Sequence, residues 1–121
     1  MIRQRLGKDL LFFDGGMGTL LQEKGLAPGE LPETWNLTHS EEIYKIHRQY
    51  IEAGSDIILT NTFGANALKF HDDSCSLEEI IKAAVSHVKK AEREALLQTG
   101  DERKIYTALD VGPTGKLLKP M

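Results

Sequence analysis

The chain has 121 residues, of which 40% are hydrophobic and 27% are charged, a composition typical of a folded globular domain. Its formal net charge of −3 excludes the strongly basic surface that nucleic acids and anionic lipids select. No apolar stretch approaches the roughly 20 residues of a membrane-spanning helix, and Met1–Leu10 carries charges where a secretory signal would be apolar. We therefore expect a cytoplasmic protein that binds neither nucleic acid nor membrane.

A strand, a glycine turn and a short helix are predicted first. Residues 9–13 form an apolar run that is too short for a helix and leads directly into the glycine-rich sequence DGGMGT at 14–19. Apolar residues then have helical spacing over 17–24, and Gly25 occupies the position of a helix C-cap. This pattern indicates a buried strand that ends in a tight turn before the helix.

A second helix and strand follow a connection, residues 27–32, that contains proline and glycine. Thr38 and Glu41 have the spacing of a capping box, and the apolar residues after them keep a helical period up to Gly54. Residues 56–60 are a continuous apolar run, which is typical of a strand covered on both faces in a parallel sheet.

The third unit has the clearest helix boundaries. Ser76 and Glu79 have capping-box spacing, the 3.6-residue period continues to about Leu97, and Gly100 follows. A short strand over 105–109 is predicted next. The order β-α-α-β-α-β, with all strands parallel, can begin either a doubly wound sheet or a closed barrel.

Three parallel strands leave two sheet edges unpaired, which natural proteins avoid. The last predicted strand also has no helix after it within residues 1–121. We therefore expect these residues to be one partial domain, truncated after its third strand.

Polar loops follow all three predicted strands, at the strand ends where parallel α/β proteins carry their reacting groups. In the first loop, Asp14 precedes Gly15 and Gly16, so a carboxylate that attracts an ammonium stands beside backbone N–H groups that can approach an anion. The pair suits an amino acid, although an incidental aspartate in a tight turn is the plain alternative. The glycine spacing fits neither a dinucleotide fingerprint nor a P-loop, which disfavours a phosphate-binding sugar enzyme.

The second and third loops offer further candidates. Asn61, Thr62 and Phe63 combine an amide, a hydroxyl and an aromatic ring that can form a ligand pocket. Asp110 begins the third loop, DVGPTG at 110–115, where it can orient a substrate amine. Ordinary polar loops contain the same residue types, so a purely structural role stays open for both.

Metal ligands and nucleophiles are not predicted. His71, Asp72, Asp73 and Cys75 are types that bind zinc, but their spacing matches no standard zinc pattern and indicates a solvated loop. We expect His39 to be a cap-region side chain and His47 to be a helix-face side chain. No Ser/His/Asp or Cys/His set at plausible positions indicates a nucleophile. Cys75 is the single cysteine, which rules out an internal disulfide.

Three motifs in register resemble the homocysteine-binding domain of the homocysteine S-methyltransferase family. They are DGGMGT at 14–19, EAGSDIILTNTFGAN at 52–66 and DVGPTG at 110–115. ELPETWNL at 30–37 and YKIHRQYIEAGSD at 44–56 are most similar to the N-terminal domain of cobalamin-dependent methionine synthase. The resemblance covers essentially the whole chain. It implies the N-terminal portion, three βα units, of a (β/α)₈ TIM barrel.

The resemblance also implies a chemistry. In the family, a Zn²⁺ ion held by three cysteine thiolates binds the homocysteine sulfur as a thiolate, which attacks a methyl group to form methionine in methionine biosynthesis. The substrate-binding residues carried over are Asp14, Gly15 and Gly16 for the amino-acid end, Asn61, Thr62 and Phe63 for the pocket wall, and Asp110 nearby. The family's zinc cysteines lie on later strands, so we expect them after Met121 and expect no catalytic residue, no metal ligand and no activity in this chain alone.

Two questions stay open at this point. The methyl donor is methylcobalamin in the methionine synthase branch, with cobalamin- and folate-binding modules downstream, and a sulfonium or betaine compound in sister branches. The second question is the class of protein, because the chain could instead be a non-catalytic half-barrel that pairs with a partner for binding or assembly. A compact dimer in sedimentation would favour the half-barrel, whereas a bare fragment should aggregate or stay partly unfolded.

Overall fold

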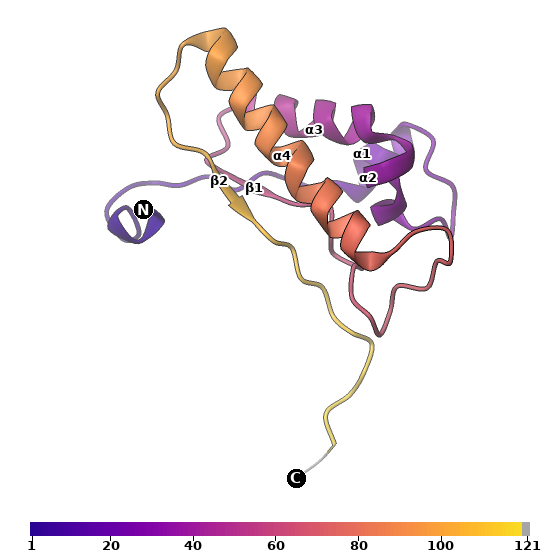
Figure 1. The fold of residues 1–121 in the computed structure, drawn as a ribbon. Coiled ribbons are helices and arrows are strands. Elements are labelled where there is room, and N and C mark those ends of the chain that lie inside the picture. Colours follow the sequence, from indigo (N-terminus) through magenta and orange to yellow (C-terminus); the bar gives the residue numbers. More distant parts are fainter. Residues whose placement is uncertain (120–121) are drawn as a thin grey trace.

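A computed structural model describes residues 1–119 as a mixed α/β fold in which helices cover one face of a small parallel sheet (Figure 1). In chain order its elements are η1 (Ile2–Gln4), α1 (Gly18–Glu23), η2 (Pro32–Thr34), α2 (Trp35–Thr38), α3 (Ser40–Glu52), β1 (Ile57–Leu59), α4 (Leu77–Thr99) and β2 (Tyr106–Ala108). No helix among these residues is long and apolar enough to cross a membrane.

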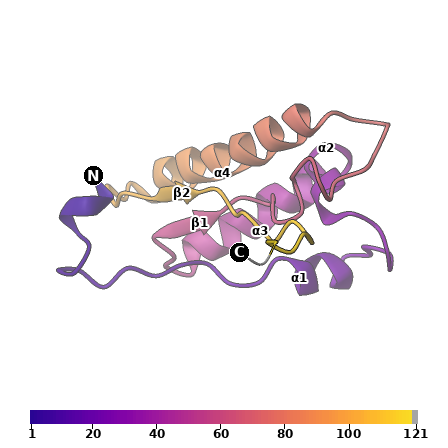
Figure 2. The same cartoon turned by 90° about the horizontal axis from the view of Figure 1, so that it is seen from below.

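The sheet pairs β1 with β2 in parallel, and Ile57 lies opposite Tyr106 and Leu59 opposite Ala108. The N-terminal segment runs along the other side of β1 (Figure 2) but forms only one parallel bridge, between Phe13 and Ile57. The predicted strand over 9–13 is therefore wrong in extent. β1 itself is only three residues long, so it offers the segment few partners, and Leu10 is 76% exposed.

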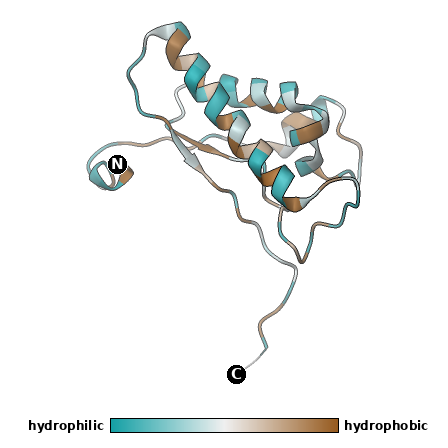
Figure 3. Cartoon of the chain, in the orientation of Figure 1, coloured by the Kyte–Doolittle hydropathy of each residue, from teal (hydrophilic) through white to brown (hydrophobic). Residues whose placement is uncertain are grey.

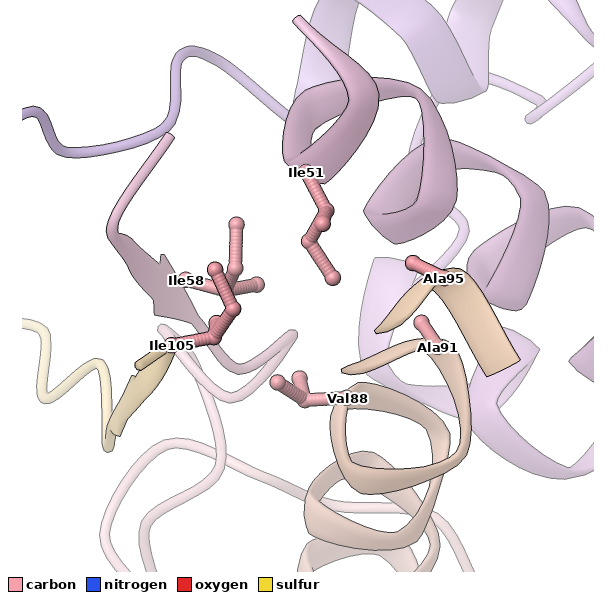
Figure 4. Close-up of a cluster of buried hydrophobic side chains, with 6 residues drawn as sticks. All are labelled: Ile51, Ile58, Val88, Ala91, Ala95 and Ile105. Carbon is pink, nitrogen blue, oxygen red and sulfur yellow. The ribbon is translucent and has the colours of Figure 1, made fainter. Parts of the chain in front are cut away.

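Helices α3 and α4 pack side by side on the sheet. Their contact with the strands is a cluster of buried aliphatic side chains, drawn in Figure 4: Ile51, Ile58, Val88, Ala91, Ala95 and Ile105. A second cluster joins α1, α2 and α3 through Leu21, Leu26, Trp35, Ile43 and Ile46. Figure 3 shows hydrophilic and hydrophobic residues alternating along α4, as its amphipathic sequence predicts.

The predicted ends of α4 are confirmed. The Ser76 hydroxyl accepts a hydrogen bond from the Glu79 N–H at 3.1 Å, and the Glu79 carboxylate accepts one from the Ser76 N–H at 2.9 Å, which completes the capping box. Gly100 ends the helix with a left-handed φ of 67°.

The predicted capping box at Thr38 and Glu41 is wrong. The Thr38 hydroxyl instead donates to the Thr34 carbonyl at 3.2 Å, because Thr38 is the last residue of α2, a short helix that the sequence did not predict. His39 takes the N-cap position of α3, and its ring stacks on Trp35 with centroids 3.9 Å apart. The cap-region prediction for His39 is thus confirmed.

The sheet keeps apolar side chains exposed at both edges. Phe12 and Phe13 are 55% and 59% exposed along the N-terminal segment, and Leu109 is 54% exposed just after β2. A closed barrel is not formed by residues 1–119. What these residues do form is three parallel segments whose carboxyl ends point the same way.

Candidate functional site

The three loops predicted to carry function meet at one cavity of about 530 Å³, at the carboxyl ends of the parallel segments. This volume is in the range of small-molecule sites. Its lining includes all seven predicted substrate-binding residues: Asp14, Gly15, Gly16, Asn61, Thr62, Phe63 and Asp110. Thr60 and Glu33 complete the polar wall, and Met17 and Leu59 are among its apolar residues.

Asp14 is half-buried where the N-terminal segment leaves β1. Its Oδ2 atom accepts a hydrogen bond from the Leu59 N–H at 3.2 Å, whereas Oδ1 is buried and has no partner among residues 1–119. Burial raises the pKa of Asp14 to about 6, and the negative charge of Asp110 acts in the same direction. An acceptor atom without a partner suits a positively charged donor from a ligand.

The glycine turn after Asp14 is held from α3. The Tyr50 hydroxyl donates to the Gly16 carbonyl at 2.7 Å, and a Cβ atom at position 15 would lie 2.8 Å from the same hydroxyl. Burial, and then the charge of Asp14, raise the pKa of Tyr50, so the phenol keeps its proton as a donor. No local sequence pattern predicts this contact, which joins residues 34 positions apart.

The second loop is tied to the segment before α3. The Asn61 amide nitrogen donates to the Pro32 carbonyl at 2.9 Å and to Asn36 Oδ1 at 3.0 Å, while the Asn36 amide donates to the Asn61 carbonyl at 2.9 Å. Asn61 therefore has a structural role in this state. Its predicted contact with substrate stays a prediction.

Glu33 is a wall residue that the sequence did not predict. It is only 4% exposed, and its Oε1 atom accepts a hydrogen bond from the Gly64 N–H at 2.6 Å. Glu33 and Asn36 are three residues apart, a spacing that places two side chains on the same face of a helix. This spacing is the one feature of the sequence that could have indicated that Glu33 points inward with Asn36. With Asp14 and Asp110, Glu33 brings three carboxylates to the cavity, and no Lys, Arg or His among residues 1–119 lines it.

The third loop contacts the second at close range. The Gly112 N–H donates to the Phe63 carbonyl at 3.0 Å, and the Thr62 hydroxyl donates to the Asp110 carbonyl at 2.7 Å. Phe63 itself is 51% exposed and belongs to the lining of the cavity.

Substituting Gly112 with alanine tests this contact. A Cβ atom there would lie 2.4 Å from the Phe63 carbonyl oxygen, which belongs to backbone and cannot move away easily. We expect Gly112→Ala to lower the free energy of unfolding by about 1–3 kcal/mol in urea denaturation. Gly18→Ala is the matched control, because nothing lies within 4 Å of that Cβ position. Equal stability of the two variants would contradict the contact.

The other polar residues singled out in the sequence lie outside the cavity. Asp72 accepts hydrogen bonds from the Ser74 N–H and hydroxyl, as in an ordinary turn. His47 is fully buried on the inner face of α3, and burial, followed by the charge of His87, lowers its pKa to about 4. Among the described residues, 1–119, no group of three or more His, Cys, Asp or Glu could hold a metal ion.

Comparison with known proteins gives the family. Residues 11–120 match the sequence profile of homocysteine S-methyltransferase. The chain belongs to the homocysteine S-methyltransferase family. The resemblance inferred from the three motifs is thereby confirmed at the level of the family.

Solved structures with a similar fold include the homocysteine methyltransferase MmuM from Escherichia coli. Its metallated and oxidised forms each align with a TM-score of 0.79 and 24% identity over 94% of the chain. Its apo form aligns with a TM-score of 0.69 and 23% identity over 89% of the chain. The chain spans 42%, 41% and 38% of the length of these three structures. At these identities the similarity establishes the fold.

Proposed function

We propose that this chain is part of a homocysteine S-methyltransferase and that its cavity binds the amino-acid end of homocysteine. The observation that carries the proposal is the charge of the cavity wall, where Asp14, Glu33 and Asp110 meet without a cationic side chain among residues 1–119. Partly buried carboxylates without a counter-charge are unfavourable. A ligand ammonium supplies the missing positive charge.

Each wall residue then has a role. Asp14 takes the ammonium, since its Oδ1 atom has no hydrogen-bond partner in residues 1–119. The backbone of Gly15 and Gly16 lies open enough for the substrate carboxylate to approach its N–H groups, and Asp110 faces the same space. Thr62, Asn61 and Phe63 shape the wall. Met17 and Leu59 offer apolar surface to the two methylene groups and the sulfur.

The family resemblance implies a zinc ion in this function, but residues 1–119 do not offer a set of ligands that suits zinc. Cys75 is the only cysteine in the sequence, and it does not line the cavity. The cavity wall carries carboxylates, hydroxyls and one amide, and residues 1–119 contain no candidate metal cluster. We propose that cysteines located after Met121 hold zinc in the complete domain, where it would make the homocysteine sulfur a thiolate.

The exposed edges of the sheet support a partial domain. Phe12, Phe13 and Leu109 are exposed, and the chain spans about two fifths of the length of MmuM. We propose that residues 1–121 form the first three units of a (β/α)₈ barrel whose other strands cover these side chains. The motifs at 30–37 and 44–56 favour the cytoplasmic methionine synthase branch, with methylcobalamin as donor and cobalamin- and folate-binding modules downstream.

Ligand titration tests the proposed site. The chain is titrated calorimetrically with L-homocysteine and with 4-mercaptobutanoate, which has the same carboxylate and thiol but no amino group. We expect homocysteine to bind at least about 10-fold more tightly, because a hydrogen bond to a charged group contributes about 1.5–3 kcal/mol. Equal affinities would contradict an ammonium site.

An activity assay tests the partial-domain proposal separately. We expect no methionine from the 121-residue chain supplied with homocysteine, zinc and methylcobalamin, because the cysteine ligands are absent from its sequence. Turnover by this chain alone would overturn the assignment of zinc to residues after Met121.

A further inference from the structure

Thr60 lies at the junction of the second and third loops, directly after β1, and is 2% exposed. Its N–H donates to the Ala108 carbonyl at 3.0 Å, which continues the ladder between β1 and β2. Its hydroxyl is close to two groups of the cavity wall. The Asp110 N–H donates to Thr60 Oγ1 at 3.3 Å, and Thr62 Oγ1 lies 2.7 Å from the same atom.

The direction of each hydrogen bond follows from the number of protons. Thr62 donates its single hydroxyl proton to the Asp110 carbonyl at 2.7 Å, because a carbonyl can only accept. Thr62 can therefore only accept from Thr60. The Thr60 hydroxyl accepts from the Asp110 N–H and donates to Thr62, which closes a ring through the peptide groups of Asp110.

This ring satisfies every polar atom in it and leaves little freedom to two residues of the site. It fixes the side-chain rotamer of Thr62, and it fixes the backbone from which the Asp110 carboxylate projects. Buried hydrogen-bond networks of this kind are stiff when all their members are satisfied. Thr60 contacts both loops through one atom, its Oγ1.

We infer that Thr60 is a positioning residue that sets the spacing of Thr62 and Asp110 for homocysteine. The inference rests on the proposed function. Thr60 acts through its two neighbours, so removing its hydroxyl should loosen Thr62 and the backbone of Asp110 while it takes no charge away from the cavity.

The test compares Thr60→Val, which has nearly the same shape but no hydroxyl, with Thr60→Ser, which keeps the hydroxyl. We expect homocysteine affinity to fall at least about 10-fold in the valine variant and to stay within about 2-fold of the unaltered chain in the serine variant. Thr107→Val is the matched control. The Thr107 hydroxyl, on β2, is buried and has no hydrogen-bond partner within the described part of the chain, so its removal should leave homocysteine affinity unchanged.

A second readout needs no ligand. Amide hydrogen exchange of Asp110, measured by NMR, should be slow in the unaltered and Thr60→Ser chains and at least about 10-fold faster in Thr60→Val. Unchanged exchange in a folded Thr60→Val variant would overturn the inference, and so would unchanged affinity. If that variant does not fold, an unprotected Asp110 amide in the unaltered chain overturns it and a protected one supports it. Failure of the unaltered chain to bind homocysteine would count against the proposed function, while the exchange result still decides the role of Thr60.

Discussion

Asp14→Asn is expected to weaken homocysteine binding by about 10- to 100-fold, as loss of a hydrogen bond between charged groups would. Asparagine keeps an oxygen that can accept from the Leu59 N–H, so the turn should keep its shape. What is lost is the negative charge next to the ligand ammonium. Calorimetric titration at about pH 7.5 measures this change.

The same substitution should stabilise the ligand-free chain at neutral pH. Burial raises the pKa of Asp14 from 3.8 to about 6, so folding disfavours the ionised carboxyl. The folded chain then holds more protons than the unfolded chain between these two pH values, and its stability falls as pH rises from about 4 to about 6. Asp14→Asn should remove this part of the pH dependence and raise the urea midpoint above pH 6.

A control substitution separates this effect from general loss of charge. Asp73 is exposed in the loop before α4, outside the cavity, so Asp73→Asn should leave homocysteine affinity unchanged. Binding by Asp14→Asn at the unaltered affinity, or a lower urea midpoint for it at neutral pH, would contradict the role given to Asp14.

Glu33→Ala is expected to have the second large effect, on stability and on binding together. It removes the acceptor for the Gly64 N–H in a side chain that is 4% exposed. A buried donor without a partner costs about 1–3 kcal/mol, and the space left by the side chain adds to this loss. We expect the free energy of unfolding to fall by about 2 kcal/mol or more, and homocysteine affinity to fall as the second loop loosens.

Glu33→Gln is the matched variant, because its side-chain oxygen can still accept from Gly64. We expect it to stay within about 1 kcal/mol of the unaltered chain in urea denaturation. If alanine and glutamine variants were equally stable, the hydrogen bond from Gly64 would not be holding the loop.

The regular elements could be predicted where local chemistry decides them. The ends of α4 depend on Ser76, Glu79 and Gly100, whose hydrogen bonds and backbone angle are properties of neighbouring residues. The gathering of Asp14, Thr62 and Asp110 at one cavity was also predictable, since parallel strands bring their carboxyl ends to one edge.

The errors and omissions have a common physical origin in contacts between distant residues. The N-terminal segment pairs at one bridge only, because the length of β1 decides how far it can pair. Thr38 has the sequence of a cap but completes α2 instead. Glu33 contacts Gly64, 31 residues away in the sequence, and Tyr50 contacts Gly16, 34 residues away. No local sequence pattern predicts contacts over such separations.

A crystal structure of the chain with L-homocysteine bound would decide whether Asp14 binds the ligand ammonium. We expect the ligand in the cavity between the three loops, with its ammonium nitrogen about 2.7–3.2 Å from a carboxylate oxygen of Asp14. Homocysteine bound outside this cavity, or bound there with its amino group turned away from Asp14, Glu33 and Asp110, would contradict it.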